Sequence, residues 1–234
     1  MVANAGRILM TQTTHHSIDY TQARGGTPPE LQLAMSPEIL IRQAVEDHLE
    51  VVRQLIEQRE LIESIAGRIS KAILAGGKVL WCGNGGSAAD CQHLAAEFVG
   101  RFRRERRGLA SVALTTDSSI LTAIGNDYGY HEIFRRQVEA LCTSRDVVVG
   151  ISTSGNSQNV CAALKEARKM GAFTVSFTGL TGGELATIAN VALKVASKDT
   201  ARIQEAHILV GHLLCDWVEL AVCSEDARVE AGQQ

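Results

Sequence analysis

The strongest constraint on the fold is an alternation that begins after Gly77. Short apolar runs rich in Val, Ile and Phe alternate there with longer runs of helical periodicity. Strands are expected at residues 78–82, 111–114, 146–151, 173–177 and 191–195, and helices at 87–103, 130–142, 156–170 and 201–222. Strands that are apolar along their whole length are typical of a parallel sheet covered on both faces. The pattern therefore predicts an α/β fold, a three-layer sandwich around a five-stranded parallel sheet with right-handed crossovers.

A long helical region is expected before this sheet. All three prolines lie at or before residue 37, so the strongest helix breaker is absent from the rest of the chain. Ser36 and Pro37 suit the N-cap and the first position of a helix, and apolar residues recur at helical spacing from there to Gly76. One or two helices of this length exceed what a small domain needs, so their apolar stripe is also expected to pack on another subunit.

Composition indicates a globular protein with one main domain. Residues 36–226 are expected to form this domain, between a mobile N-terminal tail at 1–35 and a C-terminal tail at 227–234. His15 and His16 in the first tail could bind a metal or simply be solvated. The net charge of −3 gives no global basic field for nucleic acid or membrane.

The six cysteines and the apolar runs bear on the compartment. The cysteines form no C-x-x-C pair and several lie in apolar runs, which favours buried thiols in a reducing environment. No apolar run approaches the ~20 residues of a membrane helix, and the N-terminus does not resemble a signal peptide. A cytoplasmic location is expected.

A glycine-rich loop follows the first expected strand. Its sequence is Gly83-Asn84-Gly85-Gly86-Ser87. Glycines allow the backbone to approach a ligand closely, and Ser87 would cap a helix whose free N–H groups attract an anion. A plain strand-to-helix turn is the alternative. The loop is not a P-loop, and as a dinucleotide-binding fingerprint it is weak.

A second polar loop follows the expected strand at 146–151. Ser152, Thr153, Ser154 and Ser157 place four hydroxyls within six positions, together with Gly155. Clustered hydroxyl and backbone donors suit a phosphate, whose oxygens mainly accept hydrogen bonds. The alternative is an ordinary exposed Ser/Thr loop.

A third loop is expected at residues 125–129. Its Asn126 and Asp127 could bind sugar hydroxyls or could act only as turn formers. The glycines at positions 179, 182 and 183 are interpreted as structural turns.

Candidate acid–base or metal-binding side chains lie on two of the expected helices. His93 and Glu97 are four residues apart and so share one helix face, where they could bind a divalent metal or act as acid and base. The last helix carries Gln204, His207 and His212 among apolar neighbours, where polar groups need partners. A satisfied core histidine is the alternative. Both helices start near the carboxyl edge of the sheet, so these groups could converge.

The segment 101–107 contains five arginines. We interpret it as a solvated helix end rather than a polyanion-binding patch, because the net charge is acidic and aromatic residues are scarce there.

Taken together, these motifs resemble the sugar-isomerase (SIS) domain family and, within it, the phosphoheptose isomerases. The matching segments are C-G-N-G-G-S-A-A-D-C-Q-H-L-A-A-E-F at 82–98, N-D-Y-G-Y at 126–130, G-I-S-T-S-G-N-S at 150–157, and R-I-Q-E-A-H at 202–207 followed by His212. The Ser/Thr loop alone marks only the broad superfamily, whereas the combination is far more specific.

This resemblance implies a SIS-type, flavodoxin-like fold and assigns roles to individual residues. Substrate would contact Asn84, Gly85, Gly86, Ser87, Glu97, Asn126, Asp127 and Gln204, and its phosphate would be held by Ser152, Thr153, Ser154 and Ser157. One zinc ion per subunit would be bound by His93, Glu97, Gln204 and His212. A homotetramer with active sites at subunit interfaces is also implied.

The implied reaction converts sedoheptulose 7-phosphate to D-glycero-D-manno-heptose 7-phosphate through an enediol. Glu97 would be the base and His212 would shuttle the second proton, while zinc would polarise the carbonyl. A carboxylate bound firmly to zinc is a poorer base, so Glu97 could change between the two roles. A non-catalytic SIS protein and an isomerase of another sugar phosphate are the alternatives.

Overall fold

The computed structural model describes residues 36–232 of the 234-residue chain. The tail expected at 1–35, with His15 and His16, lies outside the described residues. The chain divides into two units, Met1–Gln43 and Ala44–Gln234. The described part of the first unit is the start of helix α2 (Pro37–Arg53), where Ser36 Oγ accepts a hydrogen bond from the N–H of Ile39 at 3.3 Å, as expected of an N-cap. The division lies inside α2, C-terminal to the boundary expected at residue 35.

The expected long helices before the sheet are present. Helix α2 is followed by the 3-10 helix η2 (Gln54–Gln58) and by α3 (Arg59–Leu74). Helix α3 buries one face, to which Ile62, Ile65, Ile69 and Ile73 belong. This three- and four-residue spacing is that of an amphipathic helix, so the periodicity of the sequence predicted the element correctly.

The five expected strands form one parallel sheet in the order β2-β1-β3-β4-β5. The strands are β1 (Val79–Gly83), β2 (Ser111–Ala113), β3 (Val147–Ser152), β4 (Phe173–Thr178) and β5 (Val191–Lys194). The chain moves from β1 to β2 in one direction across the sheet and then to β3, β4 and β5 in the other. Gly83 of β1 pairs in register with Ile151 of β3, so the loops after these two strands leave the same sheet edge side by side.

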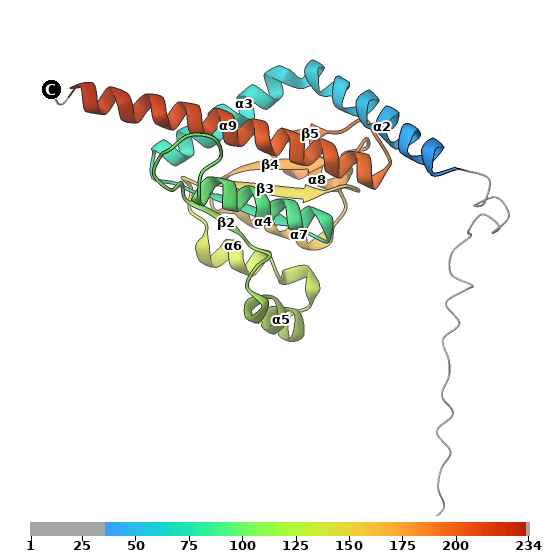
Figure 1. Cartoon of the computed structure of the whole chain (residues 1–234). Helices are drawn as coiled ribbons and strands as arrows, with labels where there is room; N and C mark the ends of the chain where they lie inside the picture. Colours follow the sequence, from blue (N-terminus) through green and yellow to red (C-terminus); the bar gives the residue numbers. More distant parts are fainter. Residues whose placement is uncertain (1–35, 233–234) are drawn as a thin grey trace, which may run out of the picture. The chain divides into compact units, whose positions relative to one another are not determined.

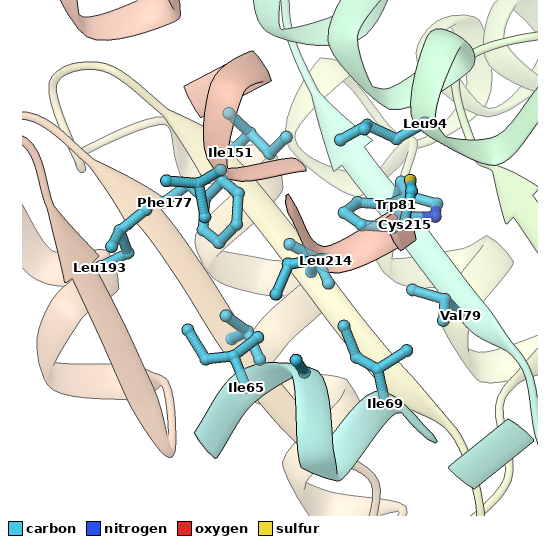
Figure 2. Close-up of a cluster of buried hydrophobic side chains, with 14 of the residues drawn as sticks. Ile65, Ile69, Val79, Trp81, Leu94, Ile151, Phe177, Leu193, Leu214 and Cys215 are labelled. Carbon is cyan, nitrogen blue, oxygen red and sulfur yellow. The ribbon is translucent and has the colours of Figure 1, made fainter. Parts of the chain in front are cut away.

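Helices cover both faces of this sheet, which confirms the three-layer α/β sandwich. Helices α3, α4 (Gly86–Val99) and α9 (Thr200–Gly232) bury one hydrophobic cluster. Helices α6 (Arg135–Leu141), α7 (Gln158–Lys169) and α8 (Gly183–Ile188) bury the other. Figure 1 shows α3 and α9 on one side of the sheet and α6 on the other. Val79 and Trp81 of β1 point into the first cluster, seen in Figure 2 with Ile65 and Leu214, whereas Leu80 and Cys82 point into the second.

The remaining helices depart from expectation in several places. Their bounds are α5 (Ser118–Asp127), η3 (Tyr130–Glu132), α6 (Arg135–Leu141), α7 (Gln158–Lys169) and α8 (Gly183–Ile188). The helix expected at 130–142 is therefore split into η3 and α6. Helices α5 and α8 were not expected, because the start of α5 is polar and α8 is too short to show a period.

Both helices that carry the candidate site residues have different ends from those expected. Helix α4 ends at Val99 instead of residue 103, and the basic segment 101–107 after it is not helical. The segment is therefore not a helix end, but it is solvated in part: the Arg101 and Arg103 side chains are 59 % and 65 % exposed, whereas the Arg106 side chain is only 2 % exposed. Helix α9 continues through Gly232, so most of the tail expected at 227–234 is helical.

All six cysteines are free thiols, and all but the half-buried Cys223 are buried, as the sequence predicted. Helix α9 is apolar enough by length and composition to cross a membrane, with a mean hydropathy of 1.5 over its most apolar window. Half of that apolar stretch is buried inside the domain, however. Residues of α9 belong to the same buried cluster as residues of the sheet, so α9 is a core helix.

The buried side chain of Asp146 stabilises the N-terminal end of strand β1. Its carboxylate, 1 % exposed, accepts hydrogen bonds from Lys78 Nζ at 2.7 Å, from the N–H of Lys78 at 2.9 Å and from the N–H of Thr143 at 2.7 Å. Burial raises the pKa of Asp146, but these hydrogen bonds outweigh burial and hold the pKa below its ordinary value. The carboxylate thus links the start of β1 to the segment between α6 and β3.

We expect Asp146→Asn to lower the free energy of unfolding by about 2–3 kcal/mol at neutral pH, because the variant loses charge-assisted hydrogen bonds in a buried place. The depressed pKa makes this stabilisation complete above the ordinary aspartate pKa, and it is lost as the pH falls through the lower, folded-state pKa. The difference between the two proteins should therefore shrink in acid. Urea denaturation over a range of pH measures it.

The matched control is Glu60→Gln, which removes a carboxylate that is 84 % exposed and lies 3.3 Å from Arg59. Solvent screens this pair, so the stability should stay at the wild-type value. Equal stability of Asp146→Asn and Glu60→Gln would contradict the role given to Asp146.

Candidate active site

A cavity of about 290 Å³ opens between the two polar loops at the carboxyl edge of the sheet. One loop follows β1, the other follows β3, and the start of α9 completes the wall. The structure brings nine of the predicted substrate-binding residues to this cavity: Asn84, Gly85, Gly86, Ser87, Ser152, Thr153, Ser154, Ser157 and Gln204. These side chains come from segments as far apart as residues 84 and 204, so the fold is what assembles them.

The Ser/Thr loop presents a compact group of hydroxyls. Ser152 Oγ lies 2.9 Å from Ser157 Oγ and 3.4 Å from Ser154 Oγ, and Ser154 Oγ accepts a hydrogen bond from the N–H of Asn156 at 3.2 Å. Helix α7 begins directly after Ser157. Hydroxyls that now bond one another, beside the N-terminus of a 12-residue helix, can turn toward an anion.

Two glycines of the neighbouring segment hold this loop in place. The carbonyl of Gly155 accepts a hydrogen bond from the N–H of Leu185 at 2.8 Å, and the carbonyl of Thr153 accepts one from the N–H of Gly179 at 3.0 Å. A Cβ at Gly155 would lie 2.1 Å from the carbonyl oxygen of Gly182, and a Cβ at Gly183 would lie 2.6 Å from Gly155. Gly182 and Gly183, interpreted from sequence as a structural turn, therefore support the Ser/Thr loop through close backbone contact.

The glycine-rich loop differs from expectation in its cap. Helix α4 begins at Gly86, and its N-cap is Gly85, which has a φ of 56° that favours glycine. Ser87 is thus buried in the first turn and is not the N-cap. A Cβ at Gly86 would lie 2.5 Å from Gln204 Nε2, so glycine is required here for the close approach of α9.

Asn84 is held by two partners that the sequence did not indicate. Its Nδ2 donates to Asn159 Oδ1 and its Oδ1 accepts from Asn159 Nδ2, both at 2.9 Å. The hydroxyl of Tyr130 donates to the same Oδ1 at 3.0 Å. This amide pair fixes the orientation of Asn84 at the edge of the cavity.

The candidate acid–base residues meet between α4 and α9. His93 Nε2 lies 2.9 Å from His212 Nε2 and 3.5 Å from Glu97 Oε1. The ring of Phe102 stacks on His212, with centroids 5.4 Å apart and an interplanar angle of 18°. The expected convergence of the two helices is therefore observed within one chain.

The surroundings of His212 favour its neutral form. Burial lowers its pKa, and the nearby His93 and Arg103 lower it further, while Glu97 acts in the opposite direction. A neutral imidazole keeps one ring nitrogen free to accept a proton. His212 is thus suited to receive and return a proton at neutral pH.

Gln204, the fourth residue of the predicted zinc site, is not beside the other three in this chain. It packs against Gly86, whereas His212 contacts His93. Seven residues separate Gly86 from His93 on one helix, which corresponds to about 10 Å of helical rise. Two imidazoles and a carboxylate are donor types that suit zinc. Across residues 36–232, however, no three His, Cys, Asp or Glu side chains form a group that could hold a metal ion.

Two further predictions take a different form in the structure. Asn126 and Asp127 lie in the last turn of α5 instead of a loop, and Asn126 Nδ2 donates to Asp127 Oδ1 at 2.8 Å. Neither lines the cavity. His207 is a core histidine: it is fully buried, its Nε2 donates to the carbonyl of Thr178 at 3.2 Å, and burial lowers its pKa to about 4.

Sequence reasoning also missed residues that contribute to the site. Thr200, the first residue of α9, lines the cavity, and Asn159 and Phe102 contact predicted site residues. The run from Ser197 to Thr200 before an apolar helix is a start signal that could have directed attention to Thr200. Nothing local in the sequence distinguishes Asn159 or Phe102, because both act through residues distant in the chain.

We expect Gly155→Ala to weaken the binding of inorganic phosphate at least about tenfold, because a Cβ there meets backbone and the φ of 70° disfavours alanine. Calorimetric titration measures the affinity, and circular dichroism checks the fold.

Gly67→Ala is the matched control. This glycine lies inside α3 with nothing within 4 Å of an added Cβ, so alanine should leave phosphate binding unchanged and stabilise the helix. Full phosphate affinity in a folded Gly155→Ala protein would argue against the Ser/Thr loop as the phosphate site.

Comparison with known proteins agrees with this geometry. The SIS domain family matches residues 43–179, more than half of the chain. The phosphoheptose isomerase of Aquifex aeolicus (strain VF5) is 55 % identical over 184 residues, which cover 79 % of this chain and 95 % of that protein. The phosphoheptose isomerase of Roseiflexus sp. (strain RS-1) is 56 % identical over 182 residues, covering 77 % and 92 %.

A solved structure indicates the same family. The phosphoheptose isomerase of Neisseria gonorrhoeae superposes with a TM-score of 0.70 at 44 % identity, covering 77 % of this chain and 98 % of that one. Sequence and fold agree over nearly the full length of these relatives. The chain belongs to the phosphoheptose isomerases of the SIS domain family, and it is a sugar-phosphate isomerase acting on a heptose phosphate.

Proposed function

We propose that this enzyme converts sedoheptulose 7-phosphate to D-glycero-D-manno-heptose 7-phosphate through an enediol. The observation that carries the proposal is the pairing of two sites on α4 and α9: the Ser/Thr cavity at their N-terminal ends, and the cluster of His93, Glu97 and His212 further along. The separation of about 10 Å along α4 suits a seven-carbon chain that carries its phosphate at one end and its reacting carbons at the other.

The cavity binds the phosphate and the neighbouring hydroxyls. Ser152, Ser154 and Ser157 turn their hydroxyls from one another toward the phosphate oxygens, and the N-terminus of α7 adds backbone N–H groups. Asn84 and Gln204 contact sugar hydroxyls from either side. Asn126 and Asp127 stay candidates for substrate contact only if another subunit brings α5 to the cavity.

The reacting carbons lie at the histidine–glutamate cluster. Glu97 removes the proton from C1, the C1–H electrons form the C1=C2 bond, and the oxygen on C2 takes a proton from solvent, which gives the enediol. Neutral His212 then accepts the proton of the C1 hydroxyl as Glu97 returns its proton to C2, and His212 afterwards releases that proton to solvent. The sum moves hydrogen from C1 to C2 and leaves an aldehyde at C1, with no net gain or loss of protons.

Zinc completes the proposal, with one ion per subunit. His93, Glu97 and His212 would hold it, with Gln204 as the fourth predicted ligand, and the bound ion would act as a Lewis acid toward the substrate carbonyl. The donor types support this assignment. Because Gln204 packs at Gly86 in its own chain, a complete set calls for a rearrangement or for Gln204 of a neighbouring subunit.

A homotetramer in the cytoplasm is part of the same proposal. An apolar groove of about 420 Å³ lies between α9 and the helices before the sheet. Its lining includes Val52, Ile56, Leu209, Leu213, Trp217 and Leu220. Ile56 is 69 % exposed, and Leu209, Leu213, Trp217 and Leu220 are 38–48 % exposed. A cluster of exposed large apolar side chains is typical of a subunit interface. Light scattering of the intact chain should give four times the mass of one chain, and a monomeric mass would contradict the proposal.

We expect Glu97→Gln to lower kcat for sedoheptulose 7-phosphate at least about 10²-fold, since the amide cannot accept the C1 proton. NMR of the sugar product measures turnover. Incubation of the wild type with a chelator in the same assay should abolish turnover, and added zinc should restore it.

Glu105→Gln serves as the control for Glu97→Gln, because its carboxylate is 92 % exposed and lies in the adjoining segment. It should retain wild-type turnover. Near-full turnover by Glu97→Gln would disprove its role as base, and full activity after chelation would disprove the zinc.

The same assay separates the alternatives. Equal turnover of five-, six- and seven-carbon ketose phosphates would favour a broader isomerase.

A further inference from the structure

We propose that the buried pair Glu219–Arg106, acting through Phe102, is a positioning device for the catalytic residues His212 and Glu97. The inference deepens the proposed function, because it rests on the roles given there to those two residues. Glu219 and Arg106 touch neither the cavity nor the proposed reacting atoms. They organise the segment after α4, seen in Figure 1 where the chain passes from α4 beside α9 toward β2.

Glu219 binds this segment through its backbone. Its carboxylate accepts hydrogen bonds from three successive N–H groups, those of Phe102, Arg103 and Arg104, each at 2.9 Å. The Glu219 side chain is 0 % exposed. Burial raises the pKa of Glu219, but the three N–H groups and Arg106 outweigh burial and hold the pKa below its ordinary value. The carboxylate is therefore ionised and gives an otherwise irregular segment one fixed conformation.

Arg106 neutralises this carboxylate and caps α4. Its Nε lies 3.0 Å from Glu219 Oε1, and its guanidinium donates to the carbonyls of Glu97 at 2.9 Å and Phe98 at 3.0 Å. These carbonyls belong to the last turn of α4, which has no further helical partners. The backbone of Glu97 is thus tied, through Arg106 and Glu219, to the helix that carries His212.

Phe102 links these backbone contacts to the ring of His212. Its own N–H is one of the three held by Glu219, and its ring stacks on the imidazole at 5.4 Å and 18°. Glu219 lies seven residues, about two turns, beyond His212 on α9, so both side chains lie on nearly the same face of the helix. Phe102 therefore covers one face of His212 and restricts its rotation while leaving the contact with His93 intact.

The stability that a buried ion pair provides does not by itself explain the presence of Glu219 and Arg106. A buried ion pair is often no more stabilising than apolar residues of similar volume. An apolar pair, however, could not bind three N–H groups and four backbone carbonyls, and these contacts set the positions of Phe102 and Glu97. A misplacement of about 1 Å at catalytic groups can lower a rate by as much as 10²-fold.

Phe102→Leu tests the stacking with little risk to the fold, because the side chain is only half-buried. We expect kcat for sedoheptulose 7-phosphate to fall roughly tenfold with KM nearly unchanged, since phosphate binding occurs elsewhere. Phe102→Tyr keeps the ring and should restore kcat.

A spectroscopic readout separates positioning from general damage. The Phe102 ring should shift the imidazole protons of His212 upfield in NMR spectra of the histidine-labelled intact protein, assigned with His212→Asn. Phe102→Leu should remove this shift, and Phe102→Tyr should keep it. The readout does not depend on turnover, so it decides the position of His212 even if sedoheptulose 7-phosphate is not the substrate.

Glu219→Gln tests the source of the positioning, with the exposed Glu105→Gln as its matched control. Glu219→Gln should lower kcat and reduce the His212 shift, and Glu105→Gln should change neither. Unchanged His212 signals in Phe102→Leu, or wild-type kcat in a folded Glu219→Gln protein, would overturn the proposal. Should Glu219→Gln fail to fold, the two Phe102 variants decide it alone.

Discussion

The reversal of strand order between β1 and β3 is the constraint on which the site depends. A parallel sheet directs all strand ends to one edge, and at the reversal two neighbouring strands send their chains to opposite faces of the sheet. The chain after β1 enters α4 on one face, and the chain after β3 enters α7 on the other. Both loops therefore stay open to a ligand at the edge. Without this reversal, the glycines of residues 83–86 and the hydroxyls of residues 152–157 would have no reason to share a cavity.

Helix α9 carries residues of the site at three levels along its axis. Gln204 meets the cavity, His212 meets His93, and Glu219 binds the segment after α4, at successive levels of one helix. A rigid helix relates these three levels by its fixed rise, so the phosphate end and the reacting end keep a constant separation. This arrangement explains why polar residues recur in a helix apolar enough to resemble a membrane span.

The sequence predicted those parts of the molecule that depend on local pattern. All five strands are predicted to within a residue, and both polar loops follow the strands as expected, because apolar runs, glycines and hydroxyls leave a local signal. Helix α5 is not evident from the sequence because its start is polar. The amide pair of Asn84 and Asn159 and the burial of Arg106 are not evident because they depend on partners far away in the chain. An arginine cluster is interpreted as solvated unless Glu219, more than a hundred residues later, is known to face it.

Two features of residues 36–232 bear on the proposed assembly of several copies of the chain. Gln204 stays at Gly86, away from the His93 cluster, and the apolar groove that includes Trp217 lies on the outer side of the same helix α9. Burying this groove against another copy would fix α9, and with it every level of the site, since helices transmit a contact on one face to the other face. Helix α9 would then couple assembly to catalysis. An interface that covers its apolar side would fix the positions of the site residues on its polar side.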